Sequence, residues 1–126
     1  MSAHDKAEFL KQVLKEGEEY AGIVFGKDGQ PDHHLILLPG QKEDVTWPVA
    51  KDWAASIGGE LPTRREQSLL FANLKEKFDQ RWYWSCEQHE SNDAWAWVQY
   101  FNDGYQGCSP KYDEFRARAV RRLIIE

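Results

Sequence analysis

The sequence predicts an α+β domain, in which helices and strands occupy separate stretches around one core. The chain has 126 residues, a length that suits a single domain with one hydrophobic core. Hydrophobic residues make up 41% of it and aromatic residues 13%, which is enough apolar surface to drive folding. Apolar residues recur at helical spacing in some stretches and alternate as in strands in others.

The first element is a predicted helix over residues 5–16. Gly17 is a typical end for it. We therefore expect residues 1–17 to be an N-terminal helical extension and residues 18–126 to be the domain proper. Its apolar stripe needs cover from the domain or from a second copy, and we expect a homo-oligomer, most simply a two-fold dimer. The stripe holds Phe9, Leu10, Val13 and Leu14.

Two strands are predicted next, over residues 20–26 and 33–38. The linker between them contains Asp28 followed by glycine, a strong hairpin signal. His33 and His34 are neighbours and point to opposite faces of a strand, so they are interpreted as strand residues and not as metal ligands.

Two further helices follow a polar connection over residues 41–45. Thr46 is the predicted N-cap of the first, which runs to residue 57. The second begins at Thr63, where Thr63 and Glu66 form a capping box. The first helix is expected to bury Trp47, Ala50, Trp53, Ala54 and Ile57.

Aromatic residues gather between residues 82 and 105, which hold four of the six tryptophans and three of the five tyrosines. Two strands are predicted, over residues 82–86 and 95–101, separated by a polar loop and followed by an Asn-Asp-Gly turn. Alternation along these strands assigns Trp84, Trp97 and Phe101 to inward faces.

The chain then continues as a loop over residues 106–114 and one last strand over residues 115–124. This strand is rich in arginine, and we expect its arginines on the solvent face. They are Arg116, Arg118, Arg121 and Arg122.

Charge and length exclude several classes of protein. The net charge of −5 and the pI of about 5.4 give no general attraction to nucleic acid or to an anionic membrane. No stretch has the apolar length of a membrane span, and the first residues are not a signal peptide, so a cytoplasmic protein is expected. Cys86 and Cys108 are then expected as reduced thiols.

Motifs for catalysis and for metal binding are missing from the sequence. It has no Ser/His/Asp pattern, phosphate-binding loop or HExxH motif, so we expect no enzyme and no cofactor. Gln30-Pro31-Asp32 and Asn92-Asp93 imitate the calcium-binding pairs of some lectins. They lie about 60 residues apart, however, and calcium needs converging oxygen ligands. No metal site is predicted.

A binding surface is predicted on the outward side of the aromatic strands and on the loops 89–93 and 102–109. Tyrosine, tryptophan, asparagine and aspartate are typical of such surfaces, because rings give contact area at little entropic cost. An alternative is that Trp95 and Tyr100 merely cover the edge of the core. The candidate ligand-binding residues are Tyr83, His89, Asn92, Asp93, Trp95, Tyr100, Asn102, Asp103, Tyr105 and Gln106.

Four blocks in order, TWPVAKDWAASIGGELPTRREQSLL, YWSCEQ, AWVQYFNDGYQ and RARAVRRL, make residues 21–123 resemble the Lcl-type C-terminal domain family. The resemblance implies a C-type-lectin-like fold, with two helices flanking a small antiparallel sheet and the N- and C-terminal strands paired. The chain departs from the family at Gln99, usually apolar, and at Cys86, usually Ser or Thr. The implied buried motif positions are Trp47, Leu61, Pro62, Thr63, Glu66, Trp84, Ser85, Trp97, Phe101, Gly104, Arg118, Ala119, Val120 and Arg121.

Family members are frequent in tailed phages and prophages, so the resemblance implies a phage or prophage protein, located in the host cytoplasm or in the virion. The leading hypothesis is a non-enzymatic module that binds a protein partner. Two alternatives remain: a calcium-independent glycan-binding lectin used in host adsorption, and an intracellular inhibitor of a host defence protein. The acidic charge would suit a basic target of such an inhibitor.

Overall fold

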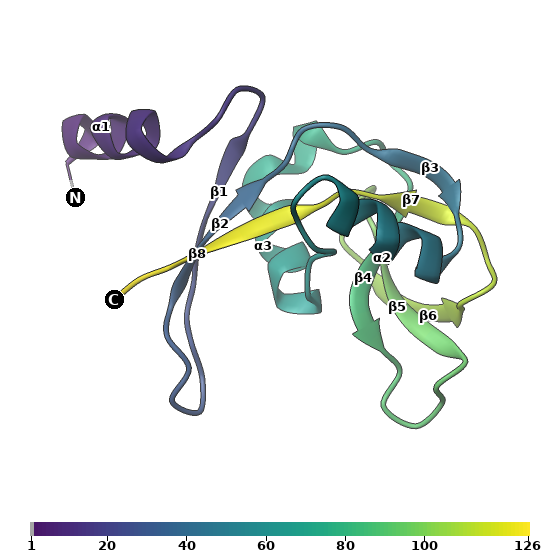
Figure 1. The fold of residues 1–126 in the computed structure, drawn as a ribbon. Coiled ribbons are helices and arrows are strands. Elements are labelled where there is room, and N and C mark those ends of the chain that lie inside the picture. Colours follow the sequence, from purple (N-terminus) through teal and green to yellow (C-terminus); the bar gives the residue numbers. More distant parts are fainter. Residues whose placement is uncertain (1) are drawn as a thin grey trace.

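A computed structural model, which describes residues 2–126, confirms the α+β class (Figure 1). Three helices accompany two separate sheets. The helices are α1 (Ala3–Val13), α2 (Trp47–Ser56) and α3 (Arg64–Leu74), and α3 runs on into a short 3-10 turn, η1 (Lys75–Lys77). Among residues 2–126, none of the helices reaches the length and apolar character that crossing a membrane requires.

The smaller sheet has three antiparallel strands in the order β1 (Glu19–Val24), β2 (His33–Leu37) and β8 (Val120–Ile124). The predicted hairpin is confirmed, because β1 pairs with β2. The last strand adds to β2 on its other side, with Leu37 opposite Val120. The C-terminal strand thus joins the sheet of the first hairpin, but it pairs with β2 and not, as the resemblance implies, with the N-terminal strand β1.

The larger sheet has five strands in the order β3, β7, β4, β5 and β6. Their bounds are β3 (Lys42–Val45), β7 (Phe115–Ala117), β4 (Trp82–Gln88), β5 (Trp95–Tyr100) and β6 (Gln106–Pro110). Its pairings are antiparallel except between β4 and β7, which run parallel with Tyr83 opposite Arg116. The expectation of one small antiparallel sheet is therefore wrong.

Three predicted elements also change. Residues 42–45 and 106–110, expected in connections, are the edge strands β3 and β6. These short polar segments carry no apolar alternation, and they are strands because neighbouring strands supply their hydrogen bonds. The single last strand is two strands, since β7 belongs to one sheet and β8 to the other. Between them, the Ala119 carbonyl accepts a bond from Leu38 N at 3.0 Å.

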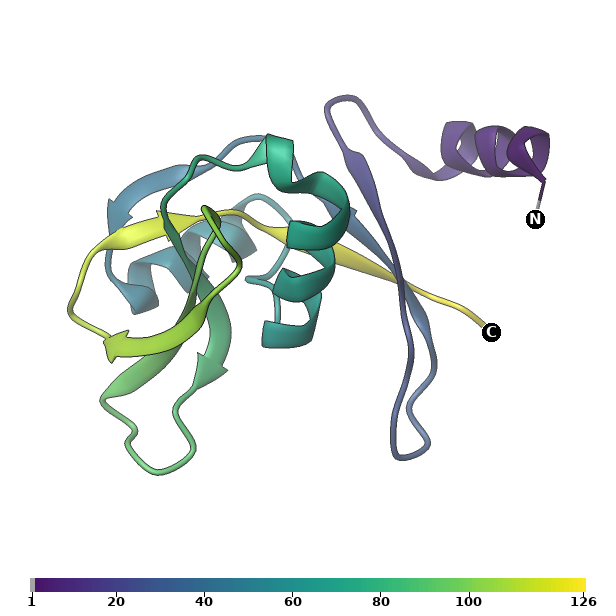
Figure 2. The same cartoon turned by 180° about the vertical axis from the view of Figure 1, so that it is seen from behind.

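Both faces of the larger sheet are covered. α2 packs on one face, where Trp84, Val98 and Ala117 lie in one buried cluster with Ala50 and Ala54. α3 lies between the other face and the three-stranded sheet, as Figure 2 shows from behind.

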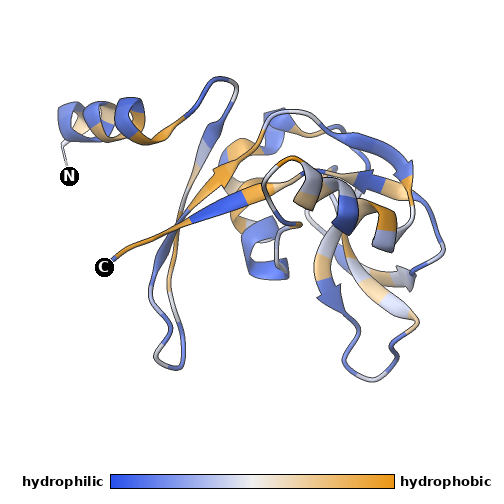
Figure 3. Cartoon of the chain, viewed as in Figure 1, coloured by the Kyte–Doolittle hydropathy of each residue, from blue (hydrophilic) through white to orange (hydrophobic). Residues whose placement is uncertain are grey.

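The second buried cluster lies around α3. It joins Leu70 and Leu74 of α3 to Leu35 and Leu37 of β2 and to Phe101. The hydrophobic stretches of β2 and α3 accordingly lie close together in Figure 3. This one helix therefore supplies core to both sheets.

The helix caps are partly as predicted. Thr63 accepts a bond from Glu66 N at 3.1 Å, and the Glu66 carboxylate accepts from Thr63 N at 2.9 Å, so the capping box is confirmed. Thr46 occupies the N-cap of α2 without a side-chain capping bond. Ile57, expected on the buried face of that helix, is 40% exposed because it lies beyond the last turn that contacts the sheet.

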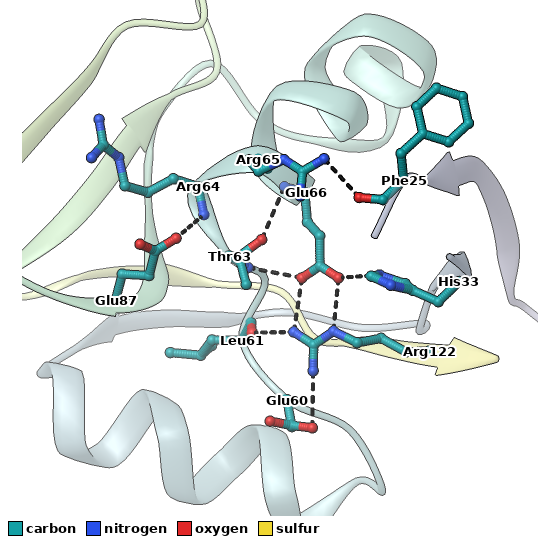
Figure 4. A network of polar contacts seen from close by, with 10 residues as sticks. All are labelled: Phe25, His33, Glu60, Leu61, Thr63, Arg64, Arg65, Glu66, Glu87 and Arg122. Carbon is teal, nitrogen blue, oxygen red and sulfur yellow. Dashed lines mark hydrogen bonds and ion pairs between the residues drawn. The ribbon is translucent and has the colours of Figure 1, made fainter. Parts of the chain in front are cut away.

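The Glu66 carboxylate also joins α3 to the three-stranded sheet (Figure 4). It is 1% exposed and accepts from Arg122 Nε at 2.7 Å and Nη2 at 2.8 Å, while His33 Nε2 lies 2.7 Å away. Burial alone would raise the pKa of Glu66, but bonds from Arg122, the Thr63 amide and His33 outweigh it and lower the pKa. α3, β8 and β2 are joined at this one group.

The expectation that the C-terminal arginines face solvent is wrong. Each guanidinium is held by groups of the protein: Arg116 pairs with Asp79, Arg118 donates to the Leu38 carbonyl at 2.7 Å, and Arg121 pairs with Glu18 at 2.8 Å. They serve as ties because an acidic side chain or a backbone carbonyl of a neighbouring segment lies within hydrogen-bond distance of each guanidinium. The four are Arg116, Arg118, Arg121 and Arg122.

α1 projects from the rest of the chain (Figure 1) and buries none of its 11 residues. Ser2 caps it by accepting from Asp5 N, and it ends at Val13, earlier than predicted, because Leu14 is extended. The Phe9 ring lies 4.6 Å from the His34 ring, and Arg121 donates to the Val13 carbonyl at 2.6 Å. The helix thus touches the three-stranded sheet, while the division of the chain at residue 17 stays a prediction.

Candidate functional site

The ten predicted ligand-binding residues do not form one surface. β4 and β5 are antiparallel, so the loop before β5 and the turn after it lie at opposite ends of that strand. At one end are His89, Asn92, Asp93 and Trp95. At the other are Tyr100, Asn102, Asp103, Tyr105 and Gln106. The two predicted loops therefore cannot contact one small ligand together.

Tyr83, expected to face outward, is 1% exposed and lies in the cluster around α3. Its hydroxyl donates to Gln41 Oε1 at 2.7 Å and accepts from Asp79 N at 3.0 Å. Burial raises the pKa of this phenol. The expectation is wrong because the sheet is covered on both faces. Alternate side chains of β4 therefore point to two buried faces, and not to one buried and one solvent-exposed face.

Of the two tryptophans assigned to inward faces, Trp84 is buried as expected and Trp97 is not. Trp84 pairs with Val98, so these two share the face toward α2, while Trp97 points to the α3 side. Trp84 is fully buried, whereas Trp97 is half-buried and belongs to neither core cluster.

Three rings form an aromatic surface at the turn end of β5, and we use this name for Trp82, Tyr100 and Tyr105. The Trp82 and Tyr100 rings stack with centroids 4.9 Å apart and an angle of 14° between their planes. Tyr105 meets Trp82 edge-on at 6.0 Å and is 64% exposed. Stacked and edge-to-face pairs are the preferred arrangements of aromatic rings, so they hold the surface in shape without a ligand.

The turn after β5 fixes the position of Tyr105. Asp103 Oδ1 accepts from Tyr105 N at 3.0 Å, and the Tyr100 carbonyl accepts from Gly104 N at 2.7 Å. Gly104 adopts φ +84°, where a side chain is unfavourable. A Cβ placed on Gly107 would stand 3.2 Å from the Tyr105 ring, so this glycine lets the ring lie against β6.

A second cluster surrounds Trp97 on the opposite face. The Arg64 guanidinium lies 3.4 Å from the centre of the Trp97 ring, a cation–π contact. The indole N–H donates to Glu90 at 3.0 Å, and the His89 ring lies nearly parallel to the indole at 6.2 Å. Much of this ring is therefore already in contact with protein side chains.

Gln106 is a structural residue. Its Nε2 donates to the Arg64 carbonyl at 2.8 Å and to Gln99 Oε1 at 2.9 Å, and its Oε1 accepts from Arg64 Nε at 3.1 Å. Gln99 is 0% exposed and donates in turn to the Gln67 carbonyl at 2.7 Å. Gln99, where the sequence departs from the pattern that the resemblance implies, thus belongs to a buried chain of amides.

The loop before β5 closes on itself. Asn92 Oδ1 accepts from Ala94 N, and His89 Nδ1 accepts from Ser91 N, both at 3.0 Å. Asn92 and Asp93 remain exposed, and Trp95 is 38% exposed beside them. This loop offers polar groups with one ring at its margin.

Neither the imitated calcium pair nor the thiols form a reactive centre. Asp32 Oδ1 accepts from Gly26 N at 2.7 Å and so braces the first hairpin. Within residues 2–126, no group of three or more His, Cys, Asp or Glu side chains is placed to hold a metal ion. Both cysteines are free thiols, and burial raises the pKa of Cys86 to about 11 and also raises that of Cys108, which disfavours the thiolate.

No model of a known protein family matches this chain, and no curated protein matches it in sequence. The resemblance to the Lcl-type family therefore stays a hypothesis that depends on the four sequence blocks.

Sequence reasoning missed three residues of these clusters: Arg64, Trp82 and Glu90. Arg64 could have been found from its place at the start of a capped helix, but its stacking on Trp97 depends on how α3 sits on the sheet. Trp82 shares with Trp84 the face of the sheet that contacts the cluster under α2. Trp82 is half-buried, because it is the first residue of β4.

Proposed function

We propose that this chain is a non-enzymatic binding module that holds a protein partner on the aromatic surface. The observation that carries the proposal is the exposure of Tyr105, 64%, on a ring cluster that needs no ligand to keep its shape. Tyrosine and tryptophan are the residues that most often dominate protein interfaces, and rings already held in place lose little entropy on binding.

The surroundings of the aromatic surface support this function. Asn102 and Asp103 are exposed at its margin and provide polar groups at the rim, which is the usual arrangement of an interface, with an apolar centre and a polar border. Asp103 has one oxygen committed to the turn.

We assign the domain to the C-type-lectin-like class. Support comes from α2 and α3 on opposite faces of the larger sheet and from the pairing of the first hairpin with β8. Superposition of an experimental structure on C-type-lectin-like domains tests this assignment. A different strand order in the common core would contradict it.

Affinity capture tests the protein-binding proposal. The wild-type chain and a Tyr100→Ala/Tyr105→Ala double variant are each used to retain proteins from a lysate of the bacterial host that the resemblance implies. The matched control is Phe25→Ala, which removes a ring that is 70% exposed on a different part of the molecule. We expect proteins that the wild type and the Phe25 variant retain and the double variant loses. If all three retain the same set, this surface does not bind the partner.

A glycan is the second candidate ligand, and the Tyr105 ring is the observation that favours it. The ring is supported from below by Gly107 and open on its exposed side, which is how a ring presents itself to a sugar. A glycan array with calcium and with chelator tests it. Binding that survives the chelator and disappears in Tyr105→Ala would support a calcium-independent lectin, and silence of the wild type on the array would exclude the glycans it displays.

A further inference from the structure

We propose that the free edge of β6 is the site at which a second copy of the chain adds, strand to strand, across a two-fold axis at Cys108. β6 is the last strand of the five-stranded sheet (Figure 1). This inference does not depend on the proposed ligand.

The backbone of β6 presents unpaired groups on that edge. Tyr100 N donates to the Tyr105 carbonyl, and Lys111 N donates to the Ala94 carbonyl. In an antiparallel pair, bonded residues alternate with residues whose groups point away. With the observed register, Gly107 and Ser109 bond to β5. The N–H and C=O groups of residues 106 and 108 and the carbonyl of Pro110 therefore point outward.

The other sheet edges are blocked. β3 carries Lys42, Glu43 and Asp44, has a break in register, and contains a left-handed residue at Asp44, φ 51°. Charges and bulges of this kind prevent a further strand from pairing.

The edges of the smaller sheet are obstructed too. β1 has a bulge near Gly22, and Asn73 of α3 donates to its Ala21 carbonyl at 2.6 Å. β8 bears two arginines and is bridged at Val120 by Glu60. β6, with the sequence QGCSP, has no charged side chain and no bulge, and its one edge-blocking residue, Pro110, stands at the end of the strand and leaves the outward N–H groups of Gln106 and Cys108 free.

The outward groups of β6 complement a second copy of themselves. In an antiparallel pair centred on Cys108, the two Cys108 residues exchange both of their bonds, and Gln106 N donates to the carbonyl of Pro110 of the partner subunit. Pro110 has no N–H, so in this register it contributes only its carbonyl as an acceptor, and the carbonyl of Gln106 of the partner subunit receives no bond from it. Both outward donors of each copy find acceptors, which gives four bonds across the axis.

We assign a second copy of the chain to this edge because the outward groups of β6 complement themselves and the strand carries no charge. A chain of net charge −5 repels itself in general, but the strand that would meet its copy is neutral throughout. A pair of five-residue strands is smaller than the interface of about 1,200–2,000 Å² that stable complexes bury. We therefore expect a dimer that dissociates on dilution.

Amide hydrogen exchange tests the interface in the intact chain. At high protein concentration the amides of Gln106 and Cys108 should be protected, and on dilution they should exchange rapidly. Gly107 and Ser109 are internal controls, because their bonds to β5 persist in the monomer. Equal exchange of Gln106 and Cys108 at all concentrations would overturn the proposal.

Two substitutions at one position provide a second test by light scattering. Cys108→Pro removes an outward N–H and leaves the bonds to β5 intact, so the chain should fold and stay at 14.7 kDa. Cys108→Ser keeps the N–H, and it should form the dimer as the wild type does. A wild type that is monomeric at every concentration, or a folded proline variant that still dimerises, would refute the proposal. Should the proline variant fail to fold, the exchange experiment decides alone.

Discussion

At the scale of the residue, Glu66 has a larger role than its motif indicates. The pattern Thr63 to Glu66 predicts a helix cap, and the cap is present. The same carboxylate is also the buried partner of Arg122 and His33, residues from two strands far away in the sequence. Local spacing shows which backbone group a side chain can reach, but it cannot show which strands the fold will bring to the other side.

Substitutions at the two ends of the capping box should therefore have unequal effects. Thr63→Ala removes one capping bond and should lower the free energy of unfolding by about 1 kcal/mol. Glu66→Ala removes the buried carboxylate that pairs with the half-buried Arg122, which keeps only the exposed Glu60 as an acidic partner, and should cost about 3 kcal/mol or more. Urea unfolding at neutral pH measures both. Equal costs would mean that Glu60 alone is a sufficient partner for Arg122.

The two strand tryptophans provide a second comparison. Trp84 is 0% exposed and donates to the Val45 carbonyl, so Trp84→Ala should cost roughly 3–5 kcal/mol. Trp97 is half-buried and packs outside the core clusters, so Trp97→Ala should cost clearly less. Midpoints of denaturant unfolding rank the variants, and the reverse order would contradict the assignment of faces.

At the scale of the element, α2, α3 and the first hairpin could be predicted from the sequence because their signals are local. Helical spacing, a capping box and an Asp-Gly turn each act within a few residues. β3, β6 and the break between β7 and β8 could not, because those segments are strands only where partners from other parts of the chain meet them. The aromatic strands were located correctly, but their exposed sides depended on two covering helices.

The contact between α1 and the three-stranded sheet is the weakest of these arrangements, since α1 buries no residue. Arg121 ties its end by bonds to the Val13 carbonyl and to Glu18. Arg121→Ala should therefore speed limited proteolysis within residues 3–16 and leave the rest of the chain resistant. Glu8→Ala, on the exposed side of the helix, is the control. Unchanged cleavage in the arginine variant would show that the Phe9 contact suffices to hold α1.

At the scale of the whole molecule, two buried carboxylates make stability depend on pH. The Arg121 bond lowers the pKa of Glu18. For Glu66, bonds from Arg122, Thr63 and His33 lower the pKa against the opposing effect of burial. A lowered pKa in the folded state means that the unfolded chain takes up protons first as the pH falls. The stabilisation is therefore present above the ordinary carboxyl value of 4.5 and is lost as the pH falls through the lowered values.

Urea unfolding measured from neutral pH to below 4.5 should show this loss. Glu66→Gln removes one of the two titrating groups, so its free energy of unfolding should start lower and decline less steeply with acid. A variant whose decline matches that of the wild type would assign the acid sensitivity to other groups.

The passage of one short segment from β7 to β8 has a consequence for how the protein is made. Neither sheet is complete until the residues after Phe115 are present, because β7 lies inside the larger sheet and β8 closes the smaller one. A nascent chain that lacks them has the hairpin, the helices and β3 to β6, but β3 has no partner strand and the hairpin lacks its third strand. Productive folding must therefore wait for the last strand to leave the ribosome, and pairing over such sequence distances is slow. Truncation near residue 115 should yield an aggregating fragment and not a smaller domain.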